Sequence, residues 1–134
     1  MKAFALHPKM LSLQGVFYPT GYAFIMFPEA AQAEQAAREL EDSGFPGQAI
    51  TLLTPDAILR EIGQVDGDSD VTLPSVGTEG ATVHKYVDLA REGHHALMVH
   101  APSEKDTERV MAVVRKHPFS YAQKYHMLAM EDLE

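Results

Sequence analysis

The sequence predicts an α+β fold of the ferredoxin-like kind, a βαββαβ sandwich with a helical insertion between its second and third strands. Three observations predict it. Apolar runs at 22–27, 49–53 and 95–101 have the length and composition of strands. Amphipathic helical patterns follow the first and third runs, and two more helical patterns separate the second run from the third. An apolar stretch at 124–130 completes the order as a closing strand.

The first strand and its helix are the clearest pair. The run "YAFIMF" at 22–27 is apolar throughout, which is typical of a central strand covered on both faces. Pro28 suits the first position of a helix, and Glu29 suits its first turn. A stripe of alanines ending in Leu40 then follows at helical spacing, and Gly44 is a stop signal.

Residues 54–92 are predicted to form the helical insertion. Thr54 has the character of a helix N-cap, and Gly63 ends the short helix that Thr54 begins. A polar loop covers residues 64–77, and a longer amphipathic helix covers about 79–92. The insertion therefore contributes two helices and no strand.

The second strand-helix unit repeats the first in outline. The run "HALMVHA" at 95–101 predicts a strand, Ser103 predicts the N-cap of the following helix, and Pro118 lies just beyond its end. We expect one domain over residues 1–134. Residues 1–20 are expected to form an N-terminal arm that packs on this domain or reaches a partner subunit.

Composition and charge limit the classes of function. The chain has 134 residues, 46% of them hydrophobic, and no cysteine, so disulfide and thiolate chemistry are both excluded. No run of 18 apolar residues is present, and the N-terminal apolar stretch is too short for a signal peptide, so we expect a soluble cytoplasmic protein with no membrane contact. The formal net charge of −8 weighs against nucleic-acid binding.

The stretch "LPSVGTEGATVHKY" at 73–86 has two interpretations. Unpaired backbone N–H groups at a helix start can bind an anion or a nucleotide phosphate, with Ser75, Gly77, Thr78 and Gly80 as the candidate residues. Helix initiation explains the same residues, with Thr78 as N-cap and Glu79 in the first turn. The missing GxxxxGK[ST] pattern favours helix initiation.

Metal and catalytic motifs are weaker. The run "DGDSD" at 66–70 places carboxylates at alternate positions, as a calcium loop does, but Val71 and Gly77 stand where such a loop needs Gly and Glu. His94 and His95 are strand neighbours that point to opposite faces and cannot share one metal ion. We find no catalytic motif and predict no enzyme activity, no metal and no cofactor.

The strand "TGYAFIMF" at 20–27 resembles the RNP1 signature of RNA-recognition motifs, with Gly21, Tyr22, Ala23, Phe24 and Phe27 matching it. The resemblance implies that Tyr22 and Phe24 face an open sheet and stack on the bases of single-stranded RNA. An alternative is that the inserted helices cover Tyr22, Phe24 and Met26 as core. The same apolar face could also form a dimer interface.

A second resemblance covers more of the chain. The segments "MFPEAAQAEQAARELEDSGFPGQAITLLTPD" and "GHHALMVHAPSEKDTERVMAVVRKH" look like those of bacterial heat-induced, general-stress-protein domains. This resemblance implies a ferredoxin-like fold, a stress-related or regulatory setting and no catalytic residues. We therefore expect a non-catalytic protein that acts by binding or oligomerisation, as a homodimer. RNA binding and nucleotide or anion sensing are the alternative functions.

Overall fold

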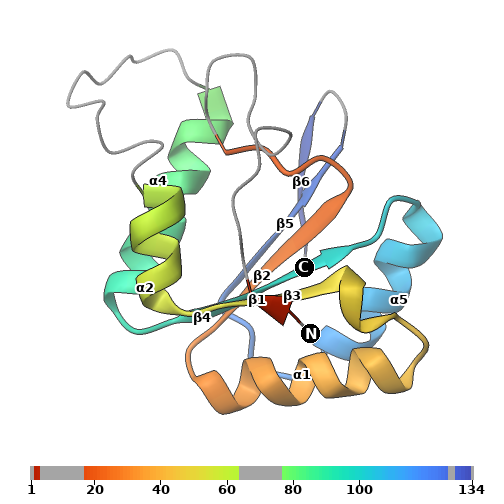
Figure 1. The fold of residues 1–134 in the computed structure, drawn as a ribbon. Coiled ribbons are helices and arrows are strands. Elements are labelled where there is room, and N and C mark those ends of the chain that lie inside the picture. Colours follow the sequence, from red (N-terminus) through yellow and green to blue (C-terminus); the bar gives the residue numbers. More distant parts are fainter. Residues whose placement is uncertain (1, 4–16, 64–76, 127–128, 134) are drawn as a thin grey trace.

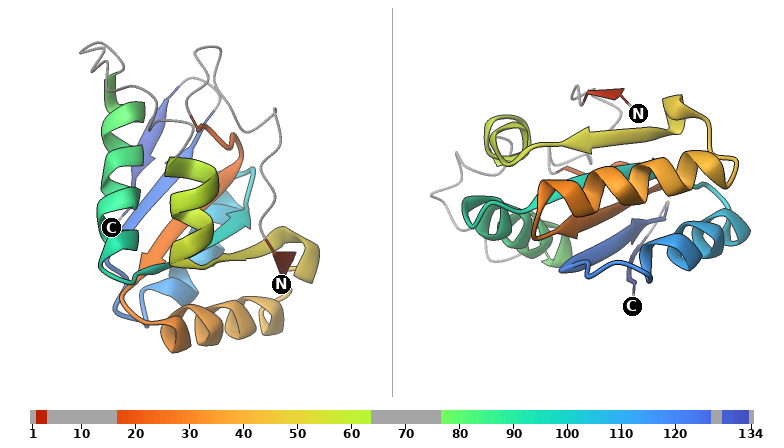
Figure 2. Two further views of the ribbon diagram at one scale, coloured as in Figure 1. Left: turned by 60° about the vertical axis from the view of Figure 1, so that its left-hand side comes forward. Right: turned by 90° about the horizontal axis from the view of Figure 1, so that it is seen from below.

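The computed structural model describes residues 2–3, 17–63, 77–126 and 129–133. One sheet lies between two helical layers (Figure 1). Helices α1 and α5 cover one face of the sheet, and α2 and α4 cover the other, as the two views of Figure 2 show. The α+β class predicted from the sequence is confirmed.

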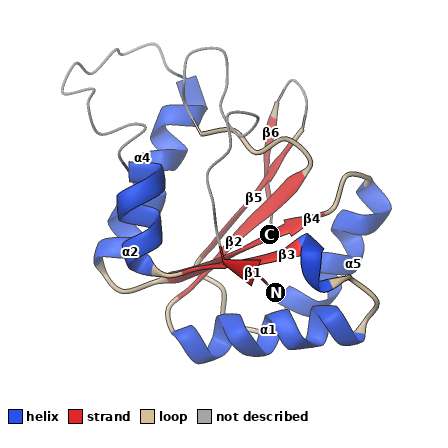
Figure 3. Ribbon diagram, in the orientation of Figure 1, coloured by secondary structure: helices blue, strands red, loops and turns tan. Residues whose placement is uncertain are grey.

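The elements follow the expected order, with additions at both ends of the chain (Figure 3). The strands are β1 (Lys2–Ala3), β2 (Tyr22–Phe27), β3 (Ile50–Leu53), β4 (His95–His100), β5 (Tyr121–Tyr125) and β6 (Met130–Asp132). The helices are α1 (Ala30–Asp42), the single turn η2 (Gly47–Ala49), α2 (Pro55–Ala57) with its wider continuation η3 (Ile58–Ile62), α4 (Gly77–Arg91) and α5 (Glu104–Val114).

The strands are arranged in the order β1-β3-β4-β2-β5-β6. Among the described strands, β1 and β3 pair in parallel, and the other neighbouring pairs are antiparallel. Strand β2 lies between β4 and β5, with Phe24 opposite Met98 on one side and Gln123 on the other. The prediction of a central strand at 22–27 is confirmed.

Side chains of β2 alternate between two hydrophobic clusters because successive residues of a strand point to opposite faces. Ala23, Ile25 and Phe27 pack with α1 and α5, and we call this set the α1–α5 cluster. Phe24 and Met26 pack with α4 and with η3, the continuation of α2, and we call this set the α2–α4 cluster. The continuous apolar sequence of β2 therefore reflects burial on both faces.

The predicted helix starts are confirmed at Thr54 and corrected at Pro28. The Thr54 hydroxyl accepts a hydrogen bond from the Ala57 N–H at 3.1 Å, as an N-cap does. Pro28 lies outside α1, and Glu29 is the N-cap instead. The Glu29 N–H donates to the Gln32 side chain at 3.1 Å. Pro28 has no backbone N–H and could not make this capping bond.

Ser103 is the N-cap of α5, as predicted. Its hydroxyl accepts a hydrogen bond from the Asp106 N–H at 3.0 Å. We expect Ser103→Ala to lower the free energy of unfolding by about 1 kcal/mol, because that N–H loses its acceptor. Urea unfolding followed by circular dichroism measures this, and Ser103→Asp, which keeps an acceptor, should retain most of the stability. An unchanged stability for Ser103→Ala would show that the cap contributes nothing.

The single closing strand predicted at 124–130 is wrong. Strand β5 begins earlier, at Tyr121, because Tyr121 to Lys124 pair with β2, and the chain then reverses. The His126 N–H donates to the Ala129 carbonyl at 2.9 Å and closes a hairpin with β6. No Gly, Pro, Asn or Asp lies at residues 126–129, so the sequence carries no turn signal here.

The described part of the segment 1–20 packs on the domain, which was the first of its two expected roles. Lys2–Ala3 forms β1 at the edge of the sheet beside β3. Phe17 and Tyr18 are buried in the α2–α4 cluster, and the Tyr18 hydroxyl donates to the His126 carbonyl at 2.7 Å. This hydrogen bond joins the segment before β2 to the residue that follows β5.

Candidate binding site

The sheet face proposed for RNA stacking or dimer formation is covered. Phe24 and Met26 are 0% exposed, because α4 and η3 lie over them. The Phe24 ring stacks on Tyr86 of α4, with centroids 4.0 Å apart and planes 25° apart. A buried ring cannot stack on a base or contact a second subunit, so these assignments for Phe24 and Met26 are corrected to core. Tyr22 is half-buried, and its ring lies 5.0 Å from that of His100.

A buried pair of tyrosine hydroxyls lies beneath α4. The hydroxyl oxygens of Tyr86 and Tyr125 are 2.7 Å apart, so each satisfies the other away from water. Burial raises the pKa of Tyr86 well above its usual value, and the neighbouring Tyr125 raises it further. The hydrogen-bonded pair joins α4 to β5.

The anion candidates do not form an open site in the described structure. Ser75 lies outside the described residues, as does the acidic run at 66–70. Helix α4 begins at Gly77, so Thr78 lies within the first turn and does not precede the helix as its N-cap. Gly80 is buried.

The described histidines do not gather around a metal position. Within the described ranges, no group of three or more His, Cys, Asp or Glu side chains is arranged to hold a metal ion. His94 bonds to the Ser120 hydroxyl at 2.8 Å, while His95 bonds to the Gly93 carbonyl at 3.2 Å. The two neighbours thus have separate partners, and His94 lies just before β4 rather than within it.

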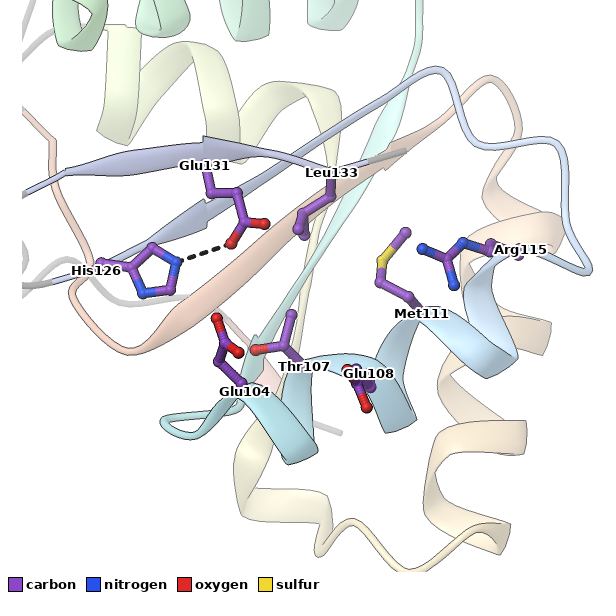
Figure 4. Close-up of a pocket in the computed structure, with 8 residues that line it drawn as sticks. All are labelled: Glu104, Thr107, Glu108, Met111, Arg115, His126, Glu131 and Leu133. Carbon is purple, nitrogen blue, oxygen red and sulfur yellow. Dashed lines mark hydrogen bonds and ion pairs between the residues drawn. The ribbon is translucent and has the colours of Figure 1, made fainter.

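A polar pocket of about 240 Å³ lies between α5 and the β5–β6 hairpin, and we call it the α5 pocket (Figure 4). It is lined by Glu104, Thr107, Glu108, Met111, Arg115, His126, Glu131 and Leu133. The helix residues recur at helical spacing, so one face of α5 forms one wall. His126 Nε2 lies 2.9 Å from Glu131 Oε1 and closes one end of the opposite wall.

A lysine is buried beside the α5 pocket. Lys124 of β5 is 1% exposed, and its Nζ donates to the Thr107 hydroxyl at 2.7 Å. The Thr107 hydroxyl in turn donates to the Ser103 carbonyl at 3.0 Å. Burial lowers the pKa of Lys124, whereas the nearby carboxylates, led by Glu131 and Glu104, act in the opposite direction. These carboxylates therefore serve partly to balance a buried charge.

A second, more open pocket of about 460 Å³ lies on the other face of the same hairpin, and we call it the α4 pocket. It is lined by Ala81, Thr82, Lys85, Tyr121, Gln123, Met130 and Asp132. Tyr121 and Met130 are half-buried and give it an apolar floor, with the Lys85 Nζ 5.9 Å from the Tyr121 ring centroid. The Gln123 side chain donates to Asp132 at 2.9 Å across the two strands.

Strand β6 separates these two pockets and is the last strand of the described sheet on this side. The Leu133 N–H donates to the Ala122 carbonyl at 3.1 Å, and the His126 N–H donates to that of Ala129. Antiparallel pairs alternate between bonded and non-bonded, so the backbone groups of Met130 and Asp132 must point away from β5. No described strand pairs with this edge of β6, and one pocket lies on each side of it. We call β5, β6 and the two pockets the hairpin surface.

Sequence reasoning missed the hairpin surface, because a single strand at 124–130 would place neither the edge nor the second pocket. Met130, Glu131, Asp132 and Leu133 do not alternate between apolar and polar residues, so the sequence carries no period-2 signal for a separate strand here.

No helix among the described residues has both the length and the apolar character needed to cross a membrane. In the comparisons with known proteins, no family model, no curated protein and no solved structure matches this chain.

Proposed function

We propose that this protein is a non-catalytic binding protein that recognises an extended segment of a partner by adding it as a strand to β6. One observation carries the proposal: β6 has a backbone edge with which no other strand of the described residues pairs, and its side chains line a pocket on each face. In strand addition, backbone hydrogen bonds to a sheet edge supply affinity, and pockets for alternate side chains supply specificity. Both requirements meet at the hairpin surface.

We also propose that the centre of the fold is ferredoxin-like. The order β3-β4-β2-β5, with α1 after β2 and α5 after β4, supports this topology. The helices of the insertion occupy the face that would otherwise be open, so binding is expected at the sheet edge rather than on the sheet. The stress-related setting implied by the sequence resemblance stays a prediction.

Asp132→Pro is expected to weaken strand addition about tenfold or more. Proline removes the outward N–H, a hydrogen bond of about 0.5–1.5 kcal/mol, and its ring obstructs the approaching strand. Pairing with β5 should survive, because the bonded residues of β6 are its neighbours. Peptides selected from a random display library against the full chain provide the ligands, and fluorescence anisotropy measures their affinity.

Asp132→Ala is the matched control for that experiment. It also loses the carboxylate that Gln123 contacts but keeps the backbone N–H. Selected peptides should therefore bind the alanine variant better than the proline variant. Equal affinity for both variants would contradict strand addition at this edge. Circular dichroism on each variant checks that the fold is retained.

A further inference from the structure

We infer that the segment bound at β6 is basic, with Lys or Arg side chains toward α5 alternating with apolar side chains toward α4. The inference rests on the proposed function, since it names the partner class for the same surface. Alternate residues of an added strand point to opposite faces of the sheet. One set would enter the α5 pocket, and the other set would enter the α4 pocket.

The α5 pocket supplies the charge that selects a basic side chain. Glu104 and Glu108 project from one wall, and Glu131 projects from the other. Glu104 and Glu108 are exposed, and the side chain of Glu131 is 52% exposed, so all three can meet a ligand. Against them stand Arg115 at the far end of α5, His126, whose Nε2 lies 2.9 Å from Glu131 Oε1, and the buried amine of Lys124. The carboxylates at the accessible surface therefore outnumber the accessible cations.

The α4 pocket differs in character. Its half-buried Tyr121 and Met130, with Ala81 of α4, offer apolar contact area. Lys85 and Asp132 carry opposite charges at its wall and balance each other. A side chain of the segment bound at β6 gains more free energy here from burying apolar surface than from any net charge.

A second copy of this chain is a poorer occupant than a basic segment. Antiparallel pairing of β6 with the β6 of another copy would bring Glu131 and Asp132 of one chain near the same residues of the other. Like charges placed opposite each other destabilise strand pairs, and charged side chains on an edge are a known protection against self-pairing. The net charge of −8 adds long-range repulsion between copies and long-range attraction for a basic segment.

Synthetic six-residue peptides, acetylated and amidated, test the inference. One alternates lysine with valine, one glutamine with valine, and one glutamate with valine. Isothermal titration calorimetry of the full chain at about 0.05 M salt should give the tightest binding for the lysine peptide. At about 0.5 M salt its advantage over the glutamine peptide should largely disappear, because screening weakens exposed ion pairs.

A charge-neutral double variant locates the effect. Glu104→Gln with Glu131→Gln should weaken the lysine peptide by about 2- to 30-fold, the range for two exposed ion pairs, and leave the glutamine peptide unchanged. Glu34→Gln with Glu92→Gln removes the same charge from exposed positions that line neither pocket, and should change neither affinity.

The possible failures are distinguishable. Equal binding of the lysine and glutamine peptides, weakened by Asp132→Pro, would overturn the basic class and leave strand addition standing. Tighter binding of the glutamate peptide would also overturn it. Absence of binding by all three peptides and by every library peptide would overturn the proposed function as well. A dimer in sedimentation velocity that Asp132→Pro dissociates would identify a second copy as the occupant and overturn the basic-segment assignment.

Discussion

Phe24→Ala is expected to lower the free energy of unfolding by about 3–5 kcal/mol, the cost of deleting a buried aromatic ring from a packed core. Phe24 is 0% exposed and contacts rings on two sides. Its centroid lies 4.0 Å from that of Tyr86 in a stacked pair and 5.8 Å from that of Phe17 in an edge contact. The cavity would therefore open between β2, α4 and the segment that leads into β2.

Urea unfolding at pH 7 measures this loss, and Tyr22→Ala is the matched control on the same strand. Tyr22 is half-buried and is the first residue of β2, so removing its ring should lower the free energy of unfolding clearly less than removing that of Phe24. A loss below about 1 kcal/mol for Phe24→Ala would contradict burial. Such a small loss would mean that the ring of Phe24 lies on an open sheet face, as the RNA-stacking alternative requires.

Lys124→Met is expected to raise the free energy of unfolding at pH 7 by about 1–4 kcal/mol, the range for exchanges of buried ion pairs for apolar side chains. Methionine is unbranched like lysine and can occupy much of its volume. The Thr107 hydroxyl keeps the Ser103 carbonyl as its acceptor, so no buried polar group loses its only partner. Lys116→Met, at a side chain that is 67% exposed, should leave stability nearly unchanged.

The stabilisation by Lys124→Met should shrink as the pH rises. Burial lowers the pKa of Lys124 in the folded state, so the unfolded state binds its proton more tightly. Stability of the natural chain then rises with pH between the lowered pKa and the ordinary value of about 10.4. The raised pKa of Tyr86 acts with the opposite sign, because the unfolded tyrosine loses its proton first, near pH 10.

Unfolding curves for the natural chain and for Lys124→Met between about pH 7 and 9.5 isolate the lysine, since Tyr86 and the other groups are common to both and the upper limit lies below the usual tyrosine pKa. A constant difference between the two curves would show that Lys124 titrates as an exposed lysine.

The homodimer expected from the sequence stays a prediction, and the same protein stocks can be used for its sedimentation measurement.

Local sequence signals predicted most of the elements because each depends on nearby residues. Strand β2 was predicted with its observed bounds from an uninterrupted apolar run. Thr54 and Ser103 were predicted as caps because a side-chain oxygen before a helix satisfies an N–H within the same turn. The helix start predicted at Pro28 was wrong because either Pro28 or Glu29 can begin this helix, and the Glu29–Gln32 contact makes Glu29 the N-cap.

The two-sided burial of β2 was readable from the sequence, but the residues that provide the second layer were not. Phe24 has the same local sequence whether a base, a second subunit or α4 covers it. Only the fold places Tyr86 over Phe24, and with that contact the RNA and dimer assignments for this face lose their exposed ring.

By itself, the sequence determined the α+β class, the strand-helix order through α5 and the absence of cysteine chemistry, since composition and periodicity act over a few residues. The tertiary structure decided the burial of Lys124, the reversal after Tyr125 and the place of β6 at the edge of the described sheet, between two pockets. Those features arise from contacts between α5, α4 and the C-terminal hairpin, segments that are distant in sequence. Their geometry depends on how whole elements pack, which no short pattern encodes.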